Sequence, residues 1–292
     1  MNEINIFEFL KSYKDKKIIY IINPGNIGDG LISYGTFNVF DKVGLDYTIS
    51  HKPYGHVYEN KILFYAAGGN TDDKNRFLKR NYANNEIVML PHTIFFGGGG
   101  NLIGLYKNCY KFLKRNIKKH NIVLLPHTIK DEDGLIKRLD DNVKIICREV
   151  KSYQYVRSVI RNKNNVFISK DMAFYINNID EYKIRKGTGT GNCFRTDVEK
   201  TDIVIPQNNK DISIGSISYK LSKEEIISRC LKMLEYLSRY EIINTNRLHV
   251  AIAGALLDRK VNLWCNNYWK NKEVYEYTLK KYKNVVWCTK KL

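Results

Sequence analysis

The chain lacks any apolar run long enough to cross a membrane as a helix. Its longest apolar stretches, Ile18–Ile22 and Ala251–Leu257, fall far short of the roughly 18 residues that such a helix needs. Residues 1–17 carry acidic side chains and predict a short amphipathic helix, without the basic start and apolar centre of a signal peptide. We therefore expect a globular cytoplasmic protein.

Metal-binding and disulfide patterns are also absent. The six cysteines are dispersed, with no Cys-x-x-Cys pair and no Cys/His cluster at zinc-ligand spacing; they stand at positions 109, 147, 193, 230, 265 and 288. We expect reduced thiols and no bound metal.

Acidic residues are in deficit, at 30 Asp and Glu against 48 Lys and Arg, for a net charge of +18. Such a charge suits nucleic acids, anionic small molecules or an anionic membrane face. However, the basic residues are scattered, and no aromatic-flanked basic motif or helix-turn-helix pattern appears. An AT-rich coding bias would also enrich Lys, Asn, Ile and Tyr. We expect no nucleic-acid partner; peripheral contact with the inner face of an anionic plasma membrane stays open.

The 292 residues are enough for two domains. Short β-branched runs alternate with helical patterns such as Leu105–Lys119 and Lys223–Arg239, which predicts βαβ units and parallel sheets, an α/β fold. The expected strands are Ile18–Ile22, Ile62–Tyr65, Thr93–Phe96, Ile122–Leu125, Val143–Cys147, Val166–Ile168, Ile242–Asn244, Val261–Trp264 and Val285–Trp287.

A polar segment, Gly187–Asp211, breaks this alternation. We place the domain junction there. The expected organisation is an N-terminal domain over 1–180, a junction over 181–204 and a C-terminal domain over 205–292.

Two glycine-rich loops follow expected strands, Asn23-Pro24-Gly25-Asn26-Ile27-Gly28-Asp29-Gly30 and Phe96-Gly97-Gly98-Gly99-Gly100-Asn101-Leu102. Open α/β sheets bind ligands at the carboxyl ends of their strands, and glycine lets a backbone approach closely. A plain βα turn or a closely packed helix would explain these glycines equally. Neither loop has the ending of a P-loop or a complete GxGxxG pattern, which argues against ATP hydrolysis and nicotinamide chemistry.

Two further strand ends deliver arginines, Arg148 followed by Glu149, and Arg247 followed by Leu248 and His249. Arg247 and His249 lie at the start of an apolar helix, whose dipole favours an anion at that end. Alternatively, Arg148 is salt-bridged and His249 is a capping or packing residue.

Taken in order, NPGNIGD, FGGGGNL, LLPHTI, CREVKS, KDMAF and TNRLHVAIAGAL, spanning residues 23 to 257, resemble the polysaccharide pyruvyl transferase family. The resemblance implies two Rossmann-like lobes facing a cleft, as in GT-B glycosyltransferases. It also implies transfer of the enolpyruvyl group of phosphoenolpyruvate, as a ketal, onto a saccharide of a surface polysaccharide such as a capsule. The saccharide acceptor could be lipid-linked.

By this resemblance Arg148 and Arg247 would hold phosphoenolpyruvate, His249 would be the general acid, and no cofactor is implied. Glu149 stands where many relatives carry aspartate, and Arg195 could equally form a structural salt bridge. Either Asp29 or Glu149 could accept the hydroxyl proton. The remaining expected substrate-binding residues are Asn26, Gly28, Asp29, Gly98, Gly99, Gly100, Asn101, Glu149, Arg195 and Leu248.

The alternative is a GT-B glycosyltransferase that uses a nucleotide sugar. The same lobes, glycine loops and helix-end arginines would suit a diphosphate. Fold alone does not separate the two activities, because the site decides the function.

Overall fold

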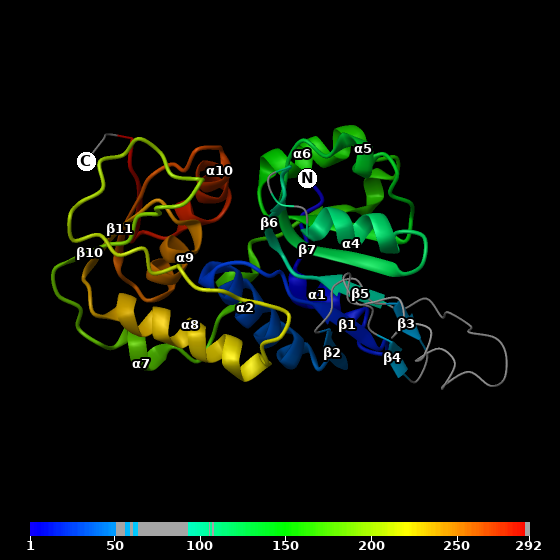
Figure 1. The fold of residues 1–292 in the computed structure, drawn as a ribbon, viewed down its shortest axis with the longest axis horizontal. Coiled ribbons are helices and arrows are strands. Elements are labelled where there is room, and N and C mark those ends of the chain that lie inside the picture. The colour runs from blue at the N-terminus through cyan, green and yellow to red at the C-terminus, as the bar shows by residue number, and fades with distance from the viewer. Residues whose placement is uncertain (51–55, 59–60, 64–92, 105, 107, 290–292) are drawn as a thin grey trace, which may run out of the picture.

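The computed structural model describes residues 1–50, 56–58, 61–63, 93–104, 106 and 108–289 (Figure 1). Its larger sheet has seven strands in the order β2-β1-β5-β7-β8-β9, with β6 paired to β7, and every pairing in it is parallel. These strands are β1 (Ile18–Ile21), β2 (Tyr47–Ser50), β5 (Thr93–Phe96), β6 (Gly99–Leu102), β7 (Asn121–Ile129), β8 (Val143–Cys147) and β9 (Val166–Ile168).

A second parallel sheet has the order β10-β11-β12-β13, formed by β10 (Thr190–Asn192), β11 (Ile242–Thr245), β12 (Lys260–Leu263) and β13 (Val285–Trp287). A separate antiparallel pair joins β3 (His56–Tyr58) to β4 (Lys61–Leu63). The expected mixed α/β fold with mostly parallel sheets is therefore confirmed.

Helices connect the strands in the pattern that parallel pairing requires. On the larger sheet's side they are α1 (Ile6–Lys11), α2 (Ile27–Val43), α4 (Asn108–Asn116), α5 (Asp133–Ile136) and α6 (Val150–Val159), with short 3₁₀ turns η1 (Lys163–Asn165) and η2 (Met172–Tyr175). Later in the chain come α7 (Asp180–Lys183), α8 (Lys223–Ser238), α9 (Leu248–Leu256), α10 (Lys270–Tyr277) and the 3₁₀ turn η3 (Leu279–Lys281). None of the described helices is long and apolar enough to span a bilayer.

Helix α2 joins the two sheets. It is buried on nearly all sides and packs on α8, α9 and η2. Gly35 makes the contact with η2 possible, because a Cβ there would lie 1.9 Å from the Met172 carbonyl oxygen. One hydrophobic cluster includes Ile22 from the larger sheet's side, Phe37 from α2 and Ile252 from α9. The two sheets thus share a continuous core, which fixes their carboxyl edges relative to each other.

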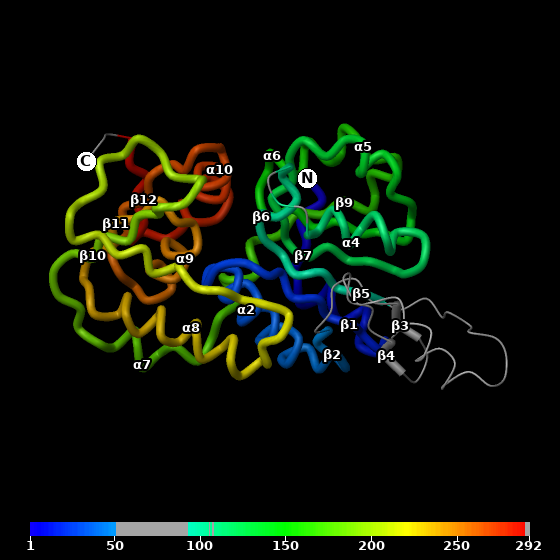
Figure 2. Tube along the Cα trace, viewed as in Figure 1, coloured from blue at the N-terminus to red at the C-terminus, as the bar shows by residue number. Residues whose placement is uncertain are grey.

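The segment between β10 and α8 crosses from the smaller sheet to the start of α2 (Figure 2). There Gly25 and Ile217 exchange two backbone hydrogen bonds of 3.0 and 2.8 Å, and Ile27 donates its N–H to the Ser213 carbonyl at 3.2 Å. This backbone staple, Gly25–Ile27 with Ser213–Ile217, fastens the crossing segment to the first glycine loop.

Candidate functional site

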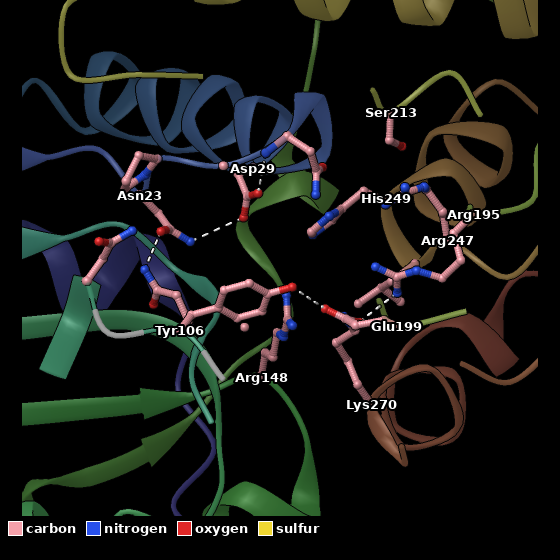
Figure 3. Close-up of a pocket in the computed structure, with 17 residues that line it drawn as sticks. Asn23, Asp29, Tyr106, Arg148, Arg195, Glu199, Ser213, Arg247, His249 and Lys270 are labelled. Atoms are coloured by element: carbon pink, nitrogen blue, oxygen red, sulfur yellow. Dashed lines mark hydrogen bonds and ion pairs between the residues drawn. The ribbon is translucent and has the colours of Figure 1, made fainter. Parts of the chain in front are cut away.

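A pocket of about 300 Å³ lies where loops from the two sheets meet (Figure 3). The larger sheet contributes the loop after β1, strand β6 and the residue after β8; the smaller sheet contributes the segment after β10, the start of α9 and the start of α10. The lining residues are Asn23, Pro24, Gly25, Asn26, Asp29, Gly100, Asn101, Tyr106, Asn108, Arg148, Arg195, Glu199, Ser213, Arg247, Leu248, His249 and Lys270.

Arg148 is fully buried and held by two partners. Its Nη1 donates to Asp171 Oδ2 at 2.6 Å, and its Nε donates to the Thr128 hydroxyl at 2.8 Å. No hydrogen bond within the described part of the chain uses Nη2, which lies 3.3 Å from where a Cβ on Gly100 would be. The absence of a side chain at Gly100 therefore leaves one edge of the guanidinium open to the pocket.

His249 shares the same carboxylate. Its Nε2 lies 3.6 Å from Asp171 Oδ2, which is too long for a hydrogen bond, so this contact is electrostatic. Nε2 is buried and has no hydrogen-bond partner among the described residues. Burial alone would raise the pKa of Asp171, but His249 and the charge of Arg148 outweigh it and hold that pKa below its usual range. Asp171 is thus an anion placed to stabilise a protonated His249.

Arg247 forms a two-pronged pair with Asp211, with Nε to Oδ1 at 2.6 Å and Nη2 to Oδ2 at 2.5 Å. Nη2 also donates to Asp197, which in turn pairs through both oxygens with Arg195. Burial disfavours the charge on Asp197, yet its bonds to Arg195 and the charge of Arg247 lower its pKa. These interlocked pairs fix both arginines on one wall of the pocket.

Glu199 connects that wall to Lys270. Glu199 Oε2 accepts from Arg195 at 2.6 Å and from Lys270 Nζ at 2.8 Å, and Oε1 accepts from the Tyr106 hydroxyl at 2.9 Å. Despite burial, Lys270 and Arg195 lower the pKa of Glu199 to about 2. Burial lowers the pKa of Lys270 to about 8, because the attraction of Glu199 does not offset it and the nearby charges of Arg195 and Arg148 add to it. Lys270 therefore changes between its charged and neutral forms at a pH close to neutrality.

Asp29 enters the pocket from the start of α2. It completes a capping box with Asn26, accepting the Asn26 N–H at 2.9 Å, and it also accepts from Asn23 Nδ2 at 3.2 Å. Asn23 accepts a short hydrogen bond from Asn101, whose Oδ1 lies 3.0 Å from His127 Nε2. Burial raises the pKa of Asp29, although His249, Lys270 and Arg148 oppose the shift. This amide chain fixes the direction in which the Asp29 carboxyl points.

Helix α9 opens toward the pocket without a side-chain cap. Its N-cap residue is Arg247, and no side-chain cap hydrogen bond forms. The first N–H groups of a helix have no partner within the helix, and its dipole places partial positive charge at that end. Leu248 and His249, both lining residues, belong to this first turn. An anionic group is thus favoured next to Arg247 and His249.

The sequence model of the polysaccharide pyruvyl transferases matches residues 26–262 of the chain. The chain belongs to the polysaccharide pyruvyl transferase family. The crystal structure of an uncharacterized protein from Klebsiella pneumoniae subsp. pneumoniae is similar at 31% identity and a TM-score of 0.76, over 98% of this chain and 97% of that one. CDC45 from Entamoeba histolytica aligns at 14% identity over 67% of this chain and 39% of that one, and its TM-score of 0.27 is too low to indicate a shared fold. No curated protein matches the chain.

Membership in the polysaccharide pyruvyl transferase family makes the chain a transferase directed at polysaccharides. The structure brings most of the sequence-predicted residues of this family member together. Those that line the pocket are Asn26, Asp29, Gly100, Asn101, Arg148, Arg195, Arg247, Leu248 and His249.

Four predicted residues are not among the lining residues: Gly28, Gly98, Gly99 and Glu149. Glu149 instead caps α6, where its Oε2 accepts the Ser152 N–H at 2.8 Å, and burial raises its pKa to about 7. Gly98 lies against the Pro126 carbonyl, and Gly99, with a φ of 128°, lies against Asn23. Glu149, Gly98 and Gly99 therefore pack behind the pocket and do not line it.

Sequence reasoning missed Lys270, Tyr106 and Asp171, and it gave Glu199 no role of its own, although the segment that holds Arg195 and Glu199 was expected to face the cleft. Neither Lys270 nor Glu199 belongs to a recognisable motif at a strand end. Only the ion pair that they form in the fold identifies them as site residues. Asp171 lies within the KDMAF stretch, so a signal was present, although it was not assigned to the site.

Gly28→Ala is expected to reduce turnover about 10²-fold. A Cβ at this position would lie 2.5 Å from His249 Nδ1 and 2.8 Å from Asn26 Oδ1, so the imidazole must shift. Steady-state kinetics would measure the loss, with Gly134→Ala as the control, because a Cβ there meets nothing within 4 Å. Equal activity of both variants would show that the packing of His249 against α2 does not matter for catalysis.

Proposed function

We propose that the protein transfers the enolpyruvyl group of phosphoenolpyruvate onto a saccharide, as a ketal, with release of phosphate. The observation that carries this proposal is the convergence on one pocket of Arg148, Arg247, Lys270, His249 and the uncapped start of α9. The donor needs several fixed cations for its two anionic groups and one acid beside them.

The donor's carboxylate and phosphate match these groups. Arginine presents planar, permanently charged donors, whereas the ammonium of Lys270 acts as a point charge. Arg148 offers its Nη2 beside Gly100, and the first turn of α9 offers backbone N–H groups. The carboxylates behind Arg148 and Arg247 hold the guanidinium groups in place for binding.

In the proposed reaction His249 donates a proton to the methylene carbon of the donor, which leaves a cationic carbon bearing the phosphate and carboxylate. One hydroxyl of the saccharide attacks that carbon and loses its proton, and the C–O bond to phosphate breaks. A second hydroxyl then attacks the same carbon and closes the ketal ring as its proton passes to the departing phosphate. Asp171 stabilises the imidazolium of His249 before transfer. Asp29 lines the pocket and Glu149 does not, which favours Asp29 as the group that accepts a hydroxyl proton.

We further propose that the two sheets form the lobes of a GT-B-like arrangement and that the enzyme works in the cytoplasm, where an acceptor on a lipid carrier would be reached at the inner membrane face. The pocket volume argues against the nucleotide-sugar alternative. At about 300 Å³ it lies at the lower end of the usual range of roughly 300–1,000 Å³ for ligand pockets. A three-carbon phosphate donor suits that volume better.

Thermal shift with phosphoenolpyruvate against a panel of nucleotide sugars tests the proposed donor. Stabilisation should rise with ligand concentration above the dissociation constant for phosphoenolpyruvate and should be absent for the panel. Mass spectrometry of candidate saccharides should then show a pyruvyl increment with loss of water. Stabilisation by a nucleotide sugar alone would replace this proposal with the glycosyltransferase alternative.

The KM for phosphoenolpyruvate is expected to rise above pH 8. Lys270, with its pKa lowered to about 8, loses its proton as pH rises through that value, and the pocket then loses a cation. The rise should approach about tenfold per pH unit in initial-rate measurements. Lys270→Arg stays charged over this range and should remove the dependence. A wild-type KM that stays flat from pH 7 to 9.5 would exclude Lys270 from donor binding.

A further inference from the structure

A second pocket, of about 590 Å³, lies outside the catalytic pocket, between the N-terminal segment, the residues after β9 and the end of α10 with η3. The N-terminal segment meets residues 277–282 here. Ile4 donates its N–H to the Ile168 carbonyl and Ile168 donates to the Asn2 carbonyl, both at 3.0 Å, so the N-terminal segment lies along the edge of β9. Tyr277 donates its hydroxyl to Glu3 at 2.8 Å. The walls are thus held by bonds between distant parts of the sequence.

Two lysines share this pocket without an acidic partner. None of the ion pairs within the described residues involves Lys170 or Lys281, and the only carboxylate in the lining belongs to Glu3. Lys170 Nζ lies 4.3 Å from the centre of the Tyr175 ring. Burial, followed by the charge of Lys281, lowers the pKa of Lys170. The pocket therefore has an excess of positive charge that the protein itself does not neutralise.

A buried hydroxyl in the same pocket has no partner. Thr278 lines the pocket and is 5% exposed, and none of the described residues forms a hydrogen bond with its Oγ1. A buried hydroxyl without a hydrogen bond costs about 1–3 kcal/mol. Because Thr278 lines the pocket, a rotation of its side chain about χ1 would let a ligand there supply the missing bond.

Three tyrosine rings also line the pocket, from Tyr175, Tyr277 and Tyr282. Tyrosine combines an apolar face with a polar edge, which suits a ring-shaped ligand that carries hydroxyl groups. Positive charge, a free hydroxyl and tyrosine rings together match a sugar that bears a phosphate or carboxylate.

We propose that this second pocket binds a negatively charged saccharide unit, as an additional contact for the acceptor beyond the sugar that reacts; the acceptor role rests on the proposed function. The segment Ser169–Asp171 connects the two pockets. Ser169 and Lys170 line the second pocket, and Asp171, the next residue, holds Arg148 and lies beside His249 at the first. The two pockets thus lie on either side of the buried Asp171.

Calorimetry with glucuronic acid and with glucose 6-phosphate, compared with glucose, inorganic phosphate and adenosine monophosphate, tests the proposal. Both acidic sugars should bind, and glucose and inorganic phosphate should bind at least tenfold more weakly. Lys170→Ala combined with Lys281→Ala should weaken binding of the acidic sugars about tenfold or more. Lys280→Ala is the matched control, because Lys280 pairs with Glu276 and does not line the pocket. Equal losses in the control would overturn the assignment.

Thr278→Val separates binding from folding. The variant loses a hydroxyl that has no protein partner, so its melting temperature should be unchanged or higher while the affinity for acidic sugars falls. Unchanged affinity in this variant, or adenosine monophosphate binding as tightly as the acidic sugars, would overturn the proposal. Turnover of phosphoenolpyruvate with a short neutral acceptor should be the same in these variants and in the wild type. A wild type without any such turnover would contradict the proposed function and the acceptor role, and would leave the binding result standing.

Discussion

His249→Gln is expected to lower turnover by about two to four orders of magnitude while phosphoenolpyruvate still binds. Nε2 of His249 is buried, has no protein hydrogen-bond partner among the described residues and lies 3.6 Å from the Asp171 carboxylate. Glutamine keeps a polar side chain of similar length but cannot donate a proton, so the loss should fall on the chemical step. Single-turnover rates and donor affinity, measured on the same preparation, would separate the two effects.

The competing role for His249 is packing at the start of α9. If the role of His249 were purely structural, replacing it would lower the free energy of unfolding by about 0.5–2 kcal/mol and leave the turnover rate of the folded protein nearly normal. His120→Gln provides a control, because His120 is buried but does not line the catalytic pocket. A folded His249→Gln protein with a near-wild-type rate would exclude the general-acid role.

Arg148→Met is expected to lower the free energy of unfolding by about 3–5 kcal/mol and to abolish donor binding. The guanidinium is 1% exposed and its partner Asp171 is 0% exposed, so the substitution leaves a buried carboxylate with only His249 and the Ala173 N–H beside it. The pKa of Asp171 in the folded variant should then rise, so the stability difference from the wild type should narrow as pH falls from 7 to about 4. Urea unfolding at several pH values would measure both effects.

Adding Asp171→Asn to Arg148→Met should restore part of the stability, because no unpaired charge is then buried. The double variant should still fail to bind phosphoenolpyruvate, since the open edge of the guanidinium is gone. A double variant whose loss equals the sum of the two single losses would show that the pair makes no energetic contribution of its own.

The sequence predicted most of the strands with β-branched runs and missed β2, β3, β6 and β10. Thr93–Phe96, Val143–Cys147, Val166–Ile168 and Val285–Trp287 appear with the bounds that their composition predicts. Strand β10, Thr190–Asn192, lies within the segment assigned to the junction, and its residues have little β-propensity; it forms because it pairs with β11 at the sheet edge. Strand β6, at Gly99–Leu102, follows β5 where a glycine-rich loop was expected. The expected strand Ile62–Tyr65 is described only as far as Leu63, within β4.

The residues of the catalytic pocket likewise fall into those that the sequence could predict and those that it could not. Residues placed at the carboxyl ends of predicted strands, such as Arg148, Arg247 and His249, could be found because parallel strands end at one edge. Glu199 and Lys270 could not, because they come from an irregular segment and a helix start that meet only in the folded chain. The arginine partners were likewise hidden, since Asp171 and Asp211 are distant in sequence from Arg148 and Arg247.

The backbone staple between Gly25–Ile27 and Ser213–Ile217 bears on how a donor enters. Its three hydrogen bonds join the crossing segment to the first glycine loop through the protein's own backbone. A donor therefore meets a preorganised cavity and does not have to order these loops, so little of its binding free energy is lost to restricting them. Association should then resemble docking into a rigid receptor, with a rate set by diffusion and charge attraction and not by a slow closing step.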